Sequence, residues 1–347
     1  MDNPFNISFG ETSLSVINRD KEFNDVVSTF DSSSPETKVF ILTGARGCGK
    51  TVLLSKIKEY YSKEKNWVTV DLNQYSNMLE QLAAKIYEEG KAKHLFLKTE
   101  FNFSFKCLSF SIQGENPVTN VDSLLDKIFK YLLKKKIKVL ITVDDVGNNN
   151  NVKQFSQAYQ SFIREKYQAY LLMTGLYENV SNLQNTNNLT FLLRAPKIQL
   201  SKLSIRSIAL SYEKYLKVNS EDATSFAKLT NGYAYGYQLL GNMLFKSTKK
   251  LVNKDILNRF DTSLEDNVYM KIWESVSLTE KTILFAMTSS NKVKEILETT
   301  KMSNSMLQVY KKRLFNAGII DISSRGLISF SLPRFKEFVN FQKQLIE

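Results

Sequence analysis

Residues 39–51 read VFILTGARGCGKT, a run of apolar and β-prone residues that leads into a glycine-rich loop ending in Gly-Lys-Thr. The pattern G-x-x-x-x-G-K-[ST] lets a curled backbone direct successive N–H groups at phosphate oxygens, because glycine adopts conformations that other residues avoid. A strand is expected directly before this loop, and the segment TVLLSKIKEYYSK predicts a helix directly after it. This strand–loop–helix context distinguishes a phosphate-binding loop from a chance glycine turn.

Each part of the loop has an expected role toward a bound nucleotide. Lys50 is expected to reach the β- and γ-phosphates, and the hydroxyl of Thr51 is expected to ligate Mg²⁺. The helix that follows directs the positive end of its dipole toward the same anion. The residues expected to bind the phosphates are Gly44, Ala45, Arg46, Gly47, Cys48, Gly49, Lys50, Thr51 and Val52.

A second apolar strand, KVLITV, is followed by two aspartates. A phosphate-binding loop needs a carboxylate on a neighbouring strand to hold Mg²⁺ through water, so Asp144 is expected in the metal shell and Asp145 beside the attacking water. Alone, the pattern fits a solvated acidic turn equally well, but its place downstream of the glycine loop favours the functional role. A third strand, AYLLMTG, places Thr174 where it is expected to point toward the γ-phosphate or the attacking water, although threonine is also common in strand cores.

Strands alternate with helices through the first 200 residues, which predicts an α/β fold with a parallel, doubly wound sheet and helices on both faces. An insertion at 96–114 alternates apolar and polar residues and predicts a β-hairpin or paired edge strands. This insertion either contacts DNA or a neighbouring subunit, or only packs on the core of the domain. The expected strands are 38–43, 67–72, 138–143 and 169–174, and the expected helices are 20–30, 50–62, 77–89, 121–135 and 152–166.

From residue 201 the pattern is helical without strands until the C-terminal segment, where three helical stretches precede two β-prone runs around a Ser-Arg-Gly turn. This order predicts a winged helix-turn-helix. Thr279 is expected to cap its first helix, Ser303 to cap the third, and Gly318 to end the third. The expected domains are a nucleotide-binding core at 1–200, a helical lid at 201–252, a linker helix at 253–277 and the winged helix at 278–347.

The outward face of the third helix and the tip of the wing carry side chains suited to base edges and phosphates. Winged helices also serve as protein–protein modules, so both kinds of partner stay open. The residues expected to contact DNA are Asn304, Ser305, Gln308, Lys311, Lys312 and Arg325.

Composition limits the partners and the compartment. There are 47 Lys and Arg against 35 Asp and Glu, and the net charge of +12 favours an anionic partner, nucleic acid before a membrane surface. Two cysteines, Cys48 and Cys107, and one histidine, His94, fit a reducing, cytoplasmic setting and argue against a zinc site. No apolar stretch reaches the roughly 18 residues that a membrane helix requires, so no membrane partner is expected. The N-terminus has no apolar signal region, so no signal peptide is expected.

Together, these motifs resemble the AAA+ P-loop ATPases of the origin-recognition initiator type, and related archaeal ATP-binding proteins that border on the STAND signalling ATPases. INRDKEFNDV is similar to the N-terminal box of the family, which implies that Arg19 lies near the adenine. FLLRAPKIQLSKLS resembles the segment that carries the arginine finger, which implies that Arg194 acts in trans within a homo-oligomer. LTNGYAYGYQLLG resembles the lid motif, with Ala234 in place of its proline.

The resemblance implies ATP and Mg²⁺ as cofactors, hydrolysis of ATP to ADP and phosphate, and double-stranded DNA as a partner. The second acid is an aspartate where most fast enzymes of the family have glutamate, and no arginine stands at the expected sensor-2 position, so slow hydrolysis is implied. A STAND-like signalling or defence switch, whose winged helix makes intramolecular or protein contacts, is the alternative. An ATP-binding scaffold without turnover is the third possibility. The implied catalytic residues are Lys50, Asp145, Thr174 and Arg194.

Overall fold

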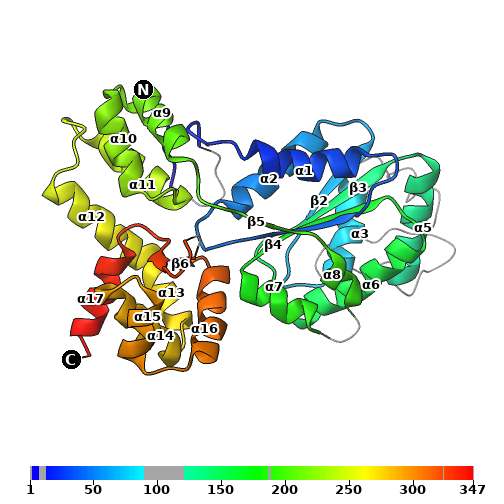
Figure 1. The fold of residues 1–347 in the computed structure, drawn as a ribbon. Helices are drawn as coiled ribbons and strands as arrows, with labels where there is room; N and C mark the ends of the chain where they lie inside the picture. The colour runs from blue at the N-terminus through cyan, green and yellow to red at the C-terminus, as the bar shows by residue number, and fades with distance from the viewer. Residues whose placement is uncertain (1, 8–12, 90–120, 187–188, 323, 347) are drawn as a thin grey trace. The chain divides into compact units, whose positions relative to one another are not determined.

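The structure is a computed structural model that describes residues 2–7, 13–89, 121–186, 189–322 and 324–346. The chain divides into two compact units, and Figure 1 traces its course. The α/β unit comprises Arg19–Thr43 and Lys50–Gln199, and the helical unit comprises Met1–Asn18, Gly44–Gly49 and Leu200–Glu347. Each unit has a hydrophobic core of its own.

A five-stranded sheet forms the centre of the α/β unit (Figure 1). Its strands are β1 (Val39–Thr43), β2 (Trp67–Leu72), β3 (Lys138–Val143), β4 (Ala169–Gly175) and β5 (Lys197–Gln199). The four longer strands are almost wholly buried, as is typical of parallel strands covered on both faces. The order is β2-β3-β4-β1-β5, and every neighbouring pair is parallel. The carboxyl ends therefore share one edge, with Thr43 beside Gly175 and Val143 beside Met173.

Helices cover both faces of this sheet. They are α1 (Asp20–Asp31), α2 (Lys50–Ser62), α3 (Met78–Glu88), α5 (Val121–Lys134), α6 (Asn150–Arg164), α7 (Tyr177–Gln184) and α8 (Thr190–Arg194). On one face, Phe30 of α1 and Tyr61 of α2 join an aromatic cluster with Tyr170 of β4. On the other, Phe129 of α5 and Tyr159 of α6 belong to the core that α3 completes. The doubly wound α/β fold expected from the sequence is confirmed.

The strand boundaries agree closely with the sequence-based expectation, but β5 was not expected. It pairs with β1, with Ile41 opposite Lys197, and lies within the segment that the resemblance associates with the arginine finger. Two of its three residues are exposed, so no buried apolar run marks it in the sequence. The hairpin expected at 96–114 lies outside the described residues, as do Cys107 and His94.

The helical unit begins with three helices at the position of the expected lid. The N-terminal segment packs on them, because Phe5, 1% exposed, contacts the rings of Tyr212 and Tyr237. Gly241 makes room for this ring, since an added Cβ would lie 2.4 Å from Phe5 Cδ1. The helices are α9 (Ile205–Leu216), α10 (Ser220–Leu229) and α11 (Ala234–Lys246).

The expected linker helix is not one regular helix. A π-helical segment, η1 (Glu265–Tyr269), separates α12 (Lys254–Leu264) from α13 (Met270–Ser275). A π turn inserts one residue into an otherwise helical run, so the apolar spacing continues almost unchanged and the sequence pattern gives no sign of it.

The C-terminal segment contains three helices, a short antiparallel hairpin and a last helix. Ser277, and not Thr279 as expected, caps the first helix, and Glu280 completes a capping box with it. The other expected cap is confirmed, since the side chain of Ser303 accepts from the amide of Met306. Gly318 follows the third helix with φ 73°. The elements are α14 (Leu278–Ser289), α15 (Val293–Thr300), α16 (Asn304–Asn316), β6 (Ile320–Asp321), β7 (Ser329–Phe330) and α17 (Phe335–Gln344).

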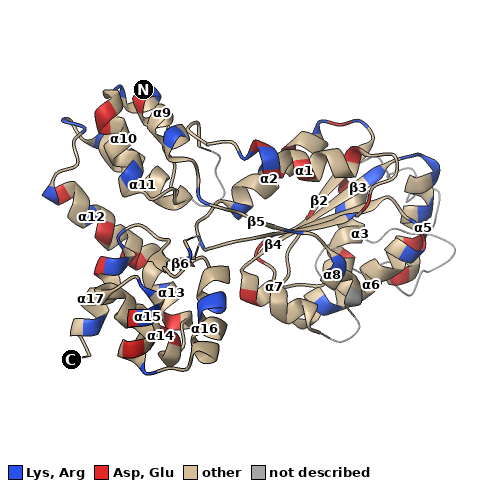
Figure 2. Ribbon diagram, in the orientation of Figure 1, with Lys and Arg blue, Asp and Glu red and all other residues tan. Residues whose placement is uncertain are grey.

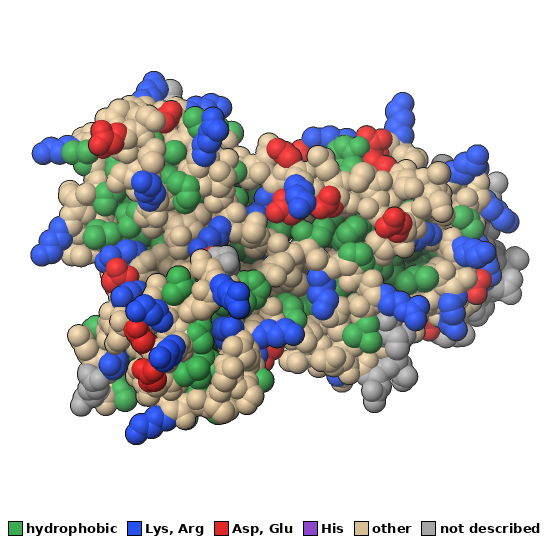
Figure 3. Space-filling view, in the orientation of Figure 1, with side chains coloured by type: hydrophobic (Ala, Val, Ile, Leu, Met, Phe, Trp, Pro, Cys, Tyr) green, Lys and Arg blue, Asp and Glu red, His purple; other side chains and the backbone are tan. Residues whose placement is uncertain are grey.

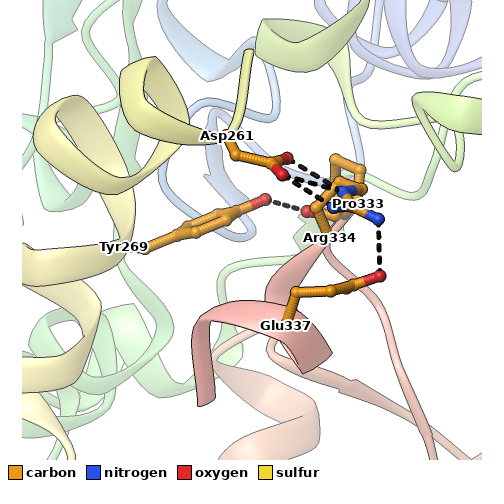
Figure 4. Close-up of polar contacts among 5 residues, drawn as sticks. All are labelled: Asp261, Tyr269, Pro333, Arg334 and Glu337. Atoms are coloured by element: carbon orange, nitrogen blue, oxygen red, sulfur yellow. Dashed lines mark hydrogen bonds and ion pairs between the residues drawn. The ribbon is translucent and has the colours of Figure 1, made fainter. Parts of the chain in front are cut away.

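Arg334 joins the start of α17 to the linker (Figure 4). Its Nε and Nη2 donate to the carboxylate of Asp261 in α12, at 2.9 and 2.7 Å, and its Nη1 donates to Glu337 Oε1 at 2.7 Å. The hydroxyl of Tyr269, in η1, donates to the carbonyl of Pro333. The hydrogen bonds to Asp261 raise the pKa of the Arg334 guanidinium, which stays charged. These contacts hold α12, η1 and α17 together.

Candidate nucleotide site

The glycine-rich loop is curled, as the motif requires. It leaves β1 after Thr43 and returns to the α/β unit at Lys50, the first residue of α2. Gly47 and Gly49 have φ angles of 74° and 95°, in the region that side chains disfavour. The loop therefore has the backbone that directs amide groups at an anion.

Lys50 and Thr51 are the first two residues of α2, and Thr51 contacts the aspartate that follows β3. Lys50 is 9% exposed, and Thr51 Oγ1 donates to Asp144 Oδ2 at 2.9 Å. Asp144 follows directly after β3, two strands away from β1 in the sheet. A hydroxyl and a carboxylate are the oxygen donors that Mg²⁺ prefers, so this pair fits the expected metal shell.

The described residues contain no group of three or more His, Cys, Asp or Glu side chains placed to bind a metal ion. Mg²⁺ usually keeps several waters and takes only one or two ligands from protein side chains, so the pair of Thr51 and Asp144 is compatible with such an ion. In the same described part of the chain, no helix is both long enough and apolar enough to cross a membrane.

Thr174 lies at the end of β4, between the glycine loop strand and the acidic strand. It is fully buried, and its hydroxyl donates to Asp144 Oδ1 and accepts from the amide of Asp145 at 2.8 Å. The hydroxyl of Thr174 thus orients the carboxylate of Asp144 and the backbone amide of Asp145. Its expected role toward the γ-phosphate or the attacking water stays a prediction.

Asp145 is exposed and has a left-handed backbone, with φ 52°. Aspartate tolerates this conformation better than most residues. Within the described residues its carboxylate makes no hydrogen bond or ion pair, so it is available to a water molecule or a ligand.

Gln74 supports the acidic loop, and the sequence analysis missed it. Its side chain is 5% exposed, Nε2 donates to the carbonyl of Asp145 at 2.6 Å, and Oε1 accepts from the amide of Gly147 at 2.7 Å and from Asn149 Nδ2 at 3.0 Å. A signal existed, because Gln74 follows β2, which is the neighbour of β3 in the parallel sheet. The edge argument that identified Asp144 applies equally to the polar residues after β2.

The two arginines suggested by the family resemblance lie at element ends. Arg19 precedes α1, and its side chain lies 3.5 Å from Glu22 and is 9% exposed. Arg194 ends α8 and is exposed. Val52, in the first turn of α2, is 38% exposed. Their expected roles toward adenine, a neighbouring copy and phosphate stay predictions.

In the helical unit, the glycine loop packs against the start of α11, in the segment predicted to be a lid, and against the C-terminal segment. The amide of Tyr235 donates to the carbonyl of Gly47 at 3.1 Å, and Tyr233 Oη donates to the carbonyl of Arg46 at 2.8 Å. A Cβ added to Gly318, just after α16, would lie 2.6 Å from Ala45 Cβ. Both segments therefore contact the loop directly.

The residues expected to contact DNA lie on α16 and in the turn before β7, and their role stays a prediction. Asn304, Ser305, Gln308 and Lys312 are exposed, Lys311 is half-buried, and Arg325 is exposed in the turn before β7. Figure 2 shows the basic residues of α16 in blue and the acidic residues that α14 and α15 carry in red. Because α16 has basic but no acidic residues, it presents a positive face.

Family models match two segments of the chain. Residues 19–175 match the KAP family P-loop domain, and residues 266–339 match a domain of unknown function (DUF8462). A comparison with curated proteins finds no match.

Solved structures share the fold over nearly the whole chain. The Walker-type ATPase PABY2304 of Pyrococcus abyssi has a TM-score of 0.63 and 13% identity, with 94% of this chain and 96% of that chain covered. The ORC2 protein of Aeropyrum pernix, in its ADPNP–ADP complexes, has a TM-score of 0.58 and 13% identity, with 98% of each chain covered. CDC6P from Pyrobaculum aerophilum has a TM-score of 0.53 and 15% identity, with 100% of this chain and 98% of that chain covered.

These identities are low, so the structural similarity concerns the fold and not the chemistry. The family match covers the glycine loop, Asp144, Asp145 and Thr174, and Thr174 lies near the end of β4 while the two aspartates directly follow β3. Residues 19–175 of this chain are therefore similar to the KAP family P-loop domain, and the chain as a whole has the fold of the PABY2304, ORC2 and CDC6P structures.

Proposed function

We propose that this protein binds ATP with Mg²⁺, hydrolyses it slowly, and couples the nucleotide to binding or remodelling of double-stranded DNA. The observation that carries the proposal is the hydrogen bond between the Thr51 hydroxyl and the Asp144 carboxylate, beside buried Lys50 and directly after a curled glycine loop. This contact supports the proposal that the predicted phosphate-binding motif and the predicted metal-binding motif serve a single site.

The residues of the site have separate tasks. The amides of residues 44–52 and the ammonium of Lys50 would bind the phosphates. Thr51 and Asp144 would hold Mg²⁺, which would supply positive charge to the phosphate oxygens. The exposed Asp145 carboxylate orients the attacking water and accepts its proton. Its side chain is one methylene shorter than glutamate, so we expect slow turnover. Arg194 of a neighbouring copy would stabilise the charge that develops on the transferred phosphoryl group.

Phosphate release from ATP tests this proposal. We expect steady release in wild type, at least tenfold less release in Asp145→Asn with ATP binding retained, and loss of binding in Lys50→Ala. ATP binding without any phosphate release above background would reduce the protein to a nucleotide-binding scaffold. Release that persists in both variants would rule out the proposed site.

We further propose that residues 278–347 form a winged helix that reads duplex DNA, with residues 1–200 as the nucleotide-binding core, 201–252 as the lid and 253–277 as the linker. The support is the order of α14, α15, α16 and the β6–β7 hairpin, together with the positive face of α16. The contacting residues would be Asn304, Ser305, Gln308, Lys311, Lys312 and Arg325.

Charge reversal tests the DNA contact. Changing Lys311, Lys312 and Arg325 to glutamate should weaken duplex binding by more than tenfold. A matched control changes to glutamate three exposed lysines at and directly after the end of α5, namely Lys134, Lys135 and Lys136. Equal duplex affinity for wild type and the α16 variant would reject DNA reading by this surface.

A second candidate is a signalling switch of the STAND type, in which the C-terminal segment is an internal clamp. The close approach of Gly318 to Ala45 supports it. So do two contacts between the lid and the hairpin, since Asn231 Nδ2 donates to the carbonyl of Ser331 at 2.8 Å and Lys202 lies 3.9 Å from Asp321. This candidate predicts that ATP releases the segment without any change in affinity for DNA, which limited proteolysis and DNA titration together would measure.

A further inference from the structure

The proposed lid donates hydrogen bonds to two backbone carbonyl groups of the glycine loop. Tyr233, 4% exposed, lies just before α11 and donates from Oη to the carbonyl of Arg46 at 2.8 Å. The amide of Tyr235, one residue into α11, donates to the next carbonyl, that of Gly47, at 3.1 Å. Two consecutive peptide groups of the loop are therefore held from the lid side.

Fixing a carbonyl also fixes an amide. A trans peptide group is planar, and its C=O and N–H point to opposite sides. With the Arg46 carbonyl bound to Tyr233, the N–H of Gly47 is turned away from the lid. In the described part of the chain this N–H has no hydrogen-bond acceptor, so it is left for a phosphate oxygen.

The fit between Tyr233 and the loop is tight. A Cβ on Gly47 would lie 2.2 Å from Tyr233 Oη, so the tyrosine occupies the space that any larger residue at position 47 would need. Burial raises the pKa of the Tyr233 hydroxyl well above its ordinary value. The hydroxyl therefore remains a donor at every pH at which the protein would work.

We propose that Tyr233 is a positioning residue for the nucleotide: its hydroxyl orients the Arg46–Gly47 peptide so that the Gly47 amide is ready to bind phosphate. This inference rests on the proposed nucleotide binding. No arginine stands at the expected sensor-2 position, and Tyr233 gives the lid another route to the phosphates, through the loop backbone. By linkage, a nucleotide that binds the loop also strengthens the grip of the lid on it.

The test is Tyr233→Phe, which keeps the ring and removes only the hydroxyl. The matched control is Tyr212→Phe, because Tyr212 is equally buried and its hydroxyl donates at 2.8 Å to the carbonyl of Tyr237, inside the lid. Calorimetry with MgADP and MgATP should show about five- to tenfold weaker binding in Tyr233→Phe and wild-type binding in Tyr212→Phe. In turnover, KM should rise in Tyr233→Phe with kcat retained, since the interaction serves binding.

Hydrogen exchange provides a second readout. In wild type, MgADP should slow exchange of the Tyr235 amide, which donates to the loop, and Tyr233→Phe should reduce this protection. Equal nucleotide affinity in wild type and Tyr233→Phe would overturn the inference and leave the proposed function intact, and so would an equal loss in Tyr212→Phe. A wild-type protein that binds neither nucleotide would overturn both.

Discussion

The side chain of Gln74 connects the loop after β2 to the loop after β3. Its Nε2 donates to the carbonyl of Asp145, and its Oε1 accepts from the amide of Gly147. Its backbone carbonyl accepts from Asn151 Nδ2 at 3.1 Å. Asp145 has a left-handed backbone and no side-chain partner among the described residues, so its position depends on such backbone contacts. Gln74 is thus placed to set where the Asp145 carboxylate lies.

We predict that Gln74→Leu lowers kcat for ATP hydrolysis about tenfold or more, with little change in the affinity for MgATP. A small displacement of a group that orients water costs rate, whereas phosphate binding uses other residues. Gln81→Leu is the control, because Gln81 bonds to Asn73 in the same connection but not to the acidic loop. Steady-state kinetics and calorimetry on both variants would check this. A Gln74→Leu enzyme with wild-type kcat would show that Asp145 needs no such support.

At the scale of residues, the sequence predicted those whose role follows from a motif and missed those whose role follows from a contact. Thr51 and Asp144 lie within hydrogen-bond distance of each other, because motif spacing and a parallel sheet determine their place, while their roles stay predictions. Gln74 and Tyr233 act through backbone groups distant in sequence, and no residue pattern encodes which carbonyl a side chain will reach. Thr279 failed as a cap because Ser277 has the glutamate three residues later that completes a capping box.

Among the elements, the connection between α12 and α17 depends on Arg334. We predict that Arg334→Met lowers the free energy of unfolding by about 1–3 kcal/mol, because the charge-assisted hydrogen bonds to Asp261 and to Glu337 are lost at a half-buried site. Arg259→Met on α12 is the control, since its pair with Asp255 is exposed and 3.8 Å long, and should cost less than about 0.5 kcal/mol. Urea unfolding of both variants measures the difference. Equal midpoints would mean that the Arg334 cluster contributes nothing.

Elements were predictable where apolar spacing is strong. The runs of β1 to β4 and the helical faces of α5 and α6 bury what their patterns indicate. The sequence did not predict β5, because it is short and largely exposed. It did not predict η1, because a π turn disturbs the helical spacing by one residue only. In both cases the structure depends on tertiary pairing, to which local propensity contributes little.

For the whole molecule, charge sets the response to salt. Figure 3 shows basic side chains spread over the visible face of both units, so the net charge of +12 alone does not locate a DNA surface. If Lys311, Lys312 and Arg325 each contact a phosphate, we predict a slope of about −3 for log K against log salt concentration with duplex DNA. The slope should flatten toward zero when all three are glutamate, and fluorescence anisotropy across a salt series would measure it. An unchanged slope in that variant would place the phosphate contacts elsewhere on the protein.

The position of β4 between β1 and β3 also bears on how the protein is made. The strand that carries the glycine loop has β4 and β5 as its only sheet neighbours in the described residues, and both are synthesised well over one hundred residues later. A growing chain therefore holds β1 without a partner while β2 and β3 already have each other. The five-stranded sheet cannot form until β4 has been synthesised. Until then the nascent chain carries an unpaired apolar strand, which we expect chaperones to shield.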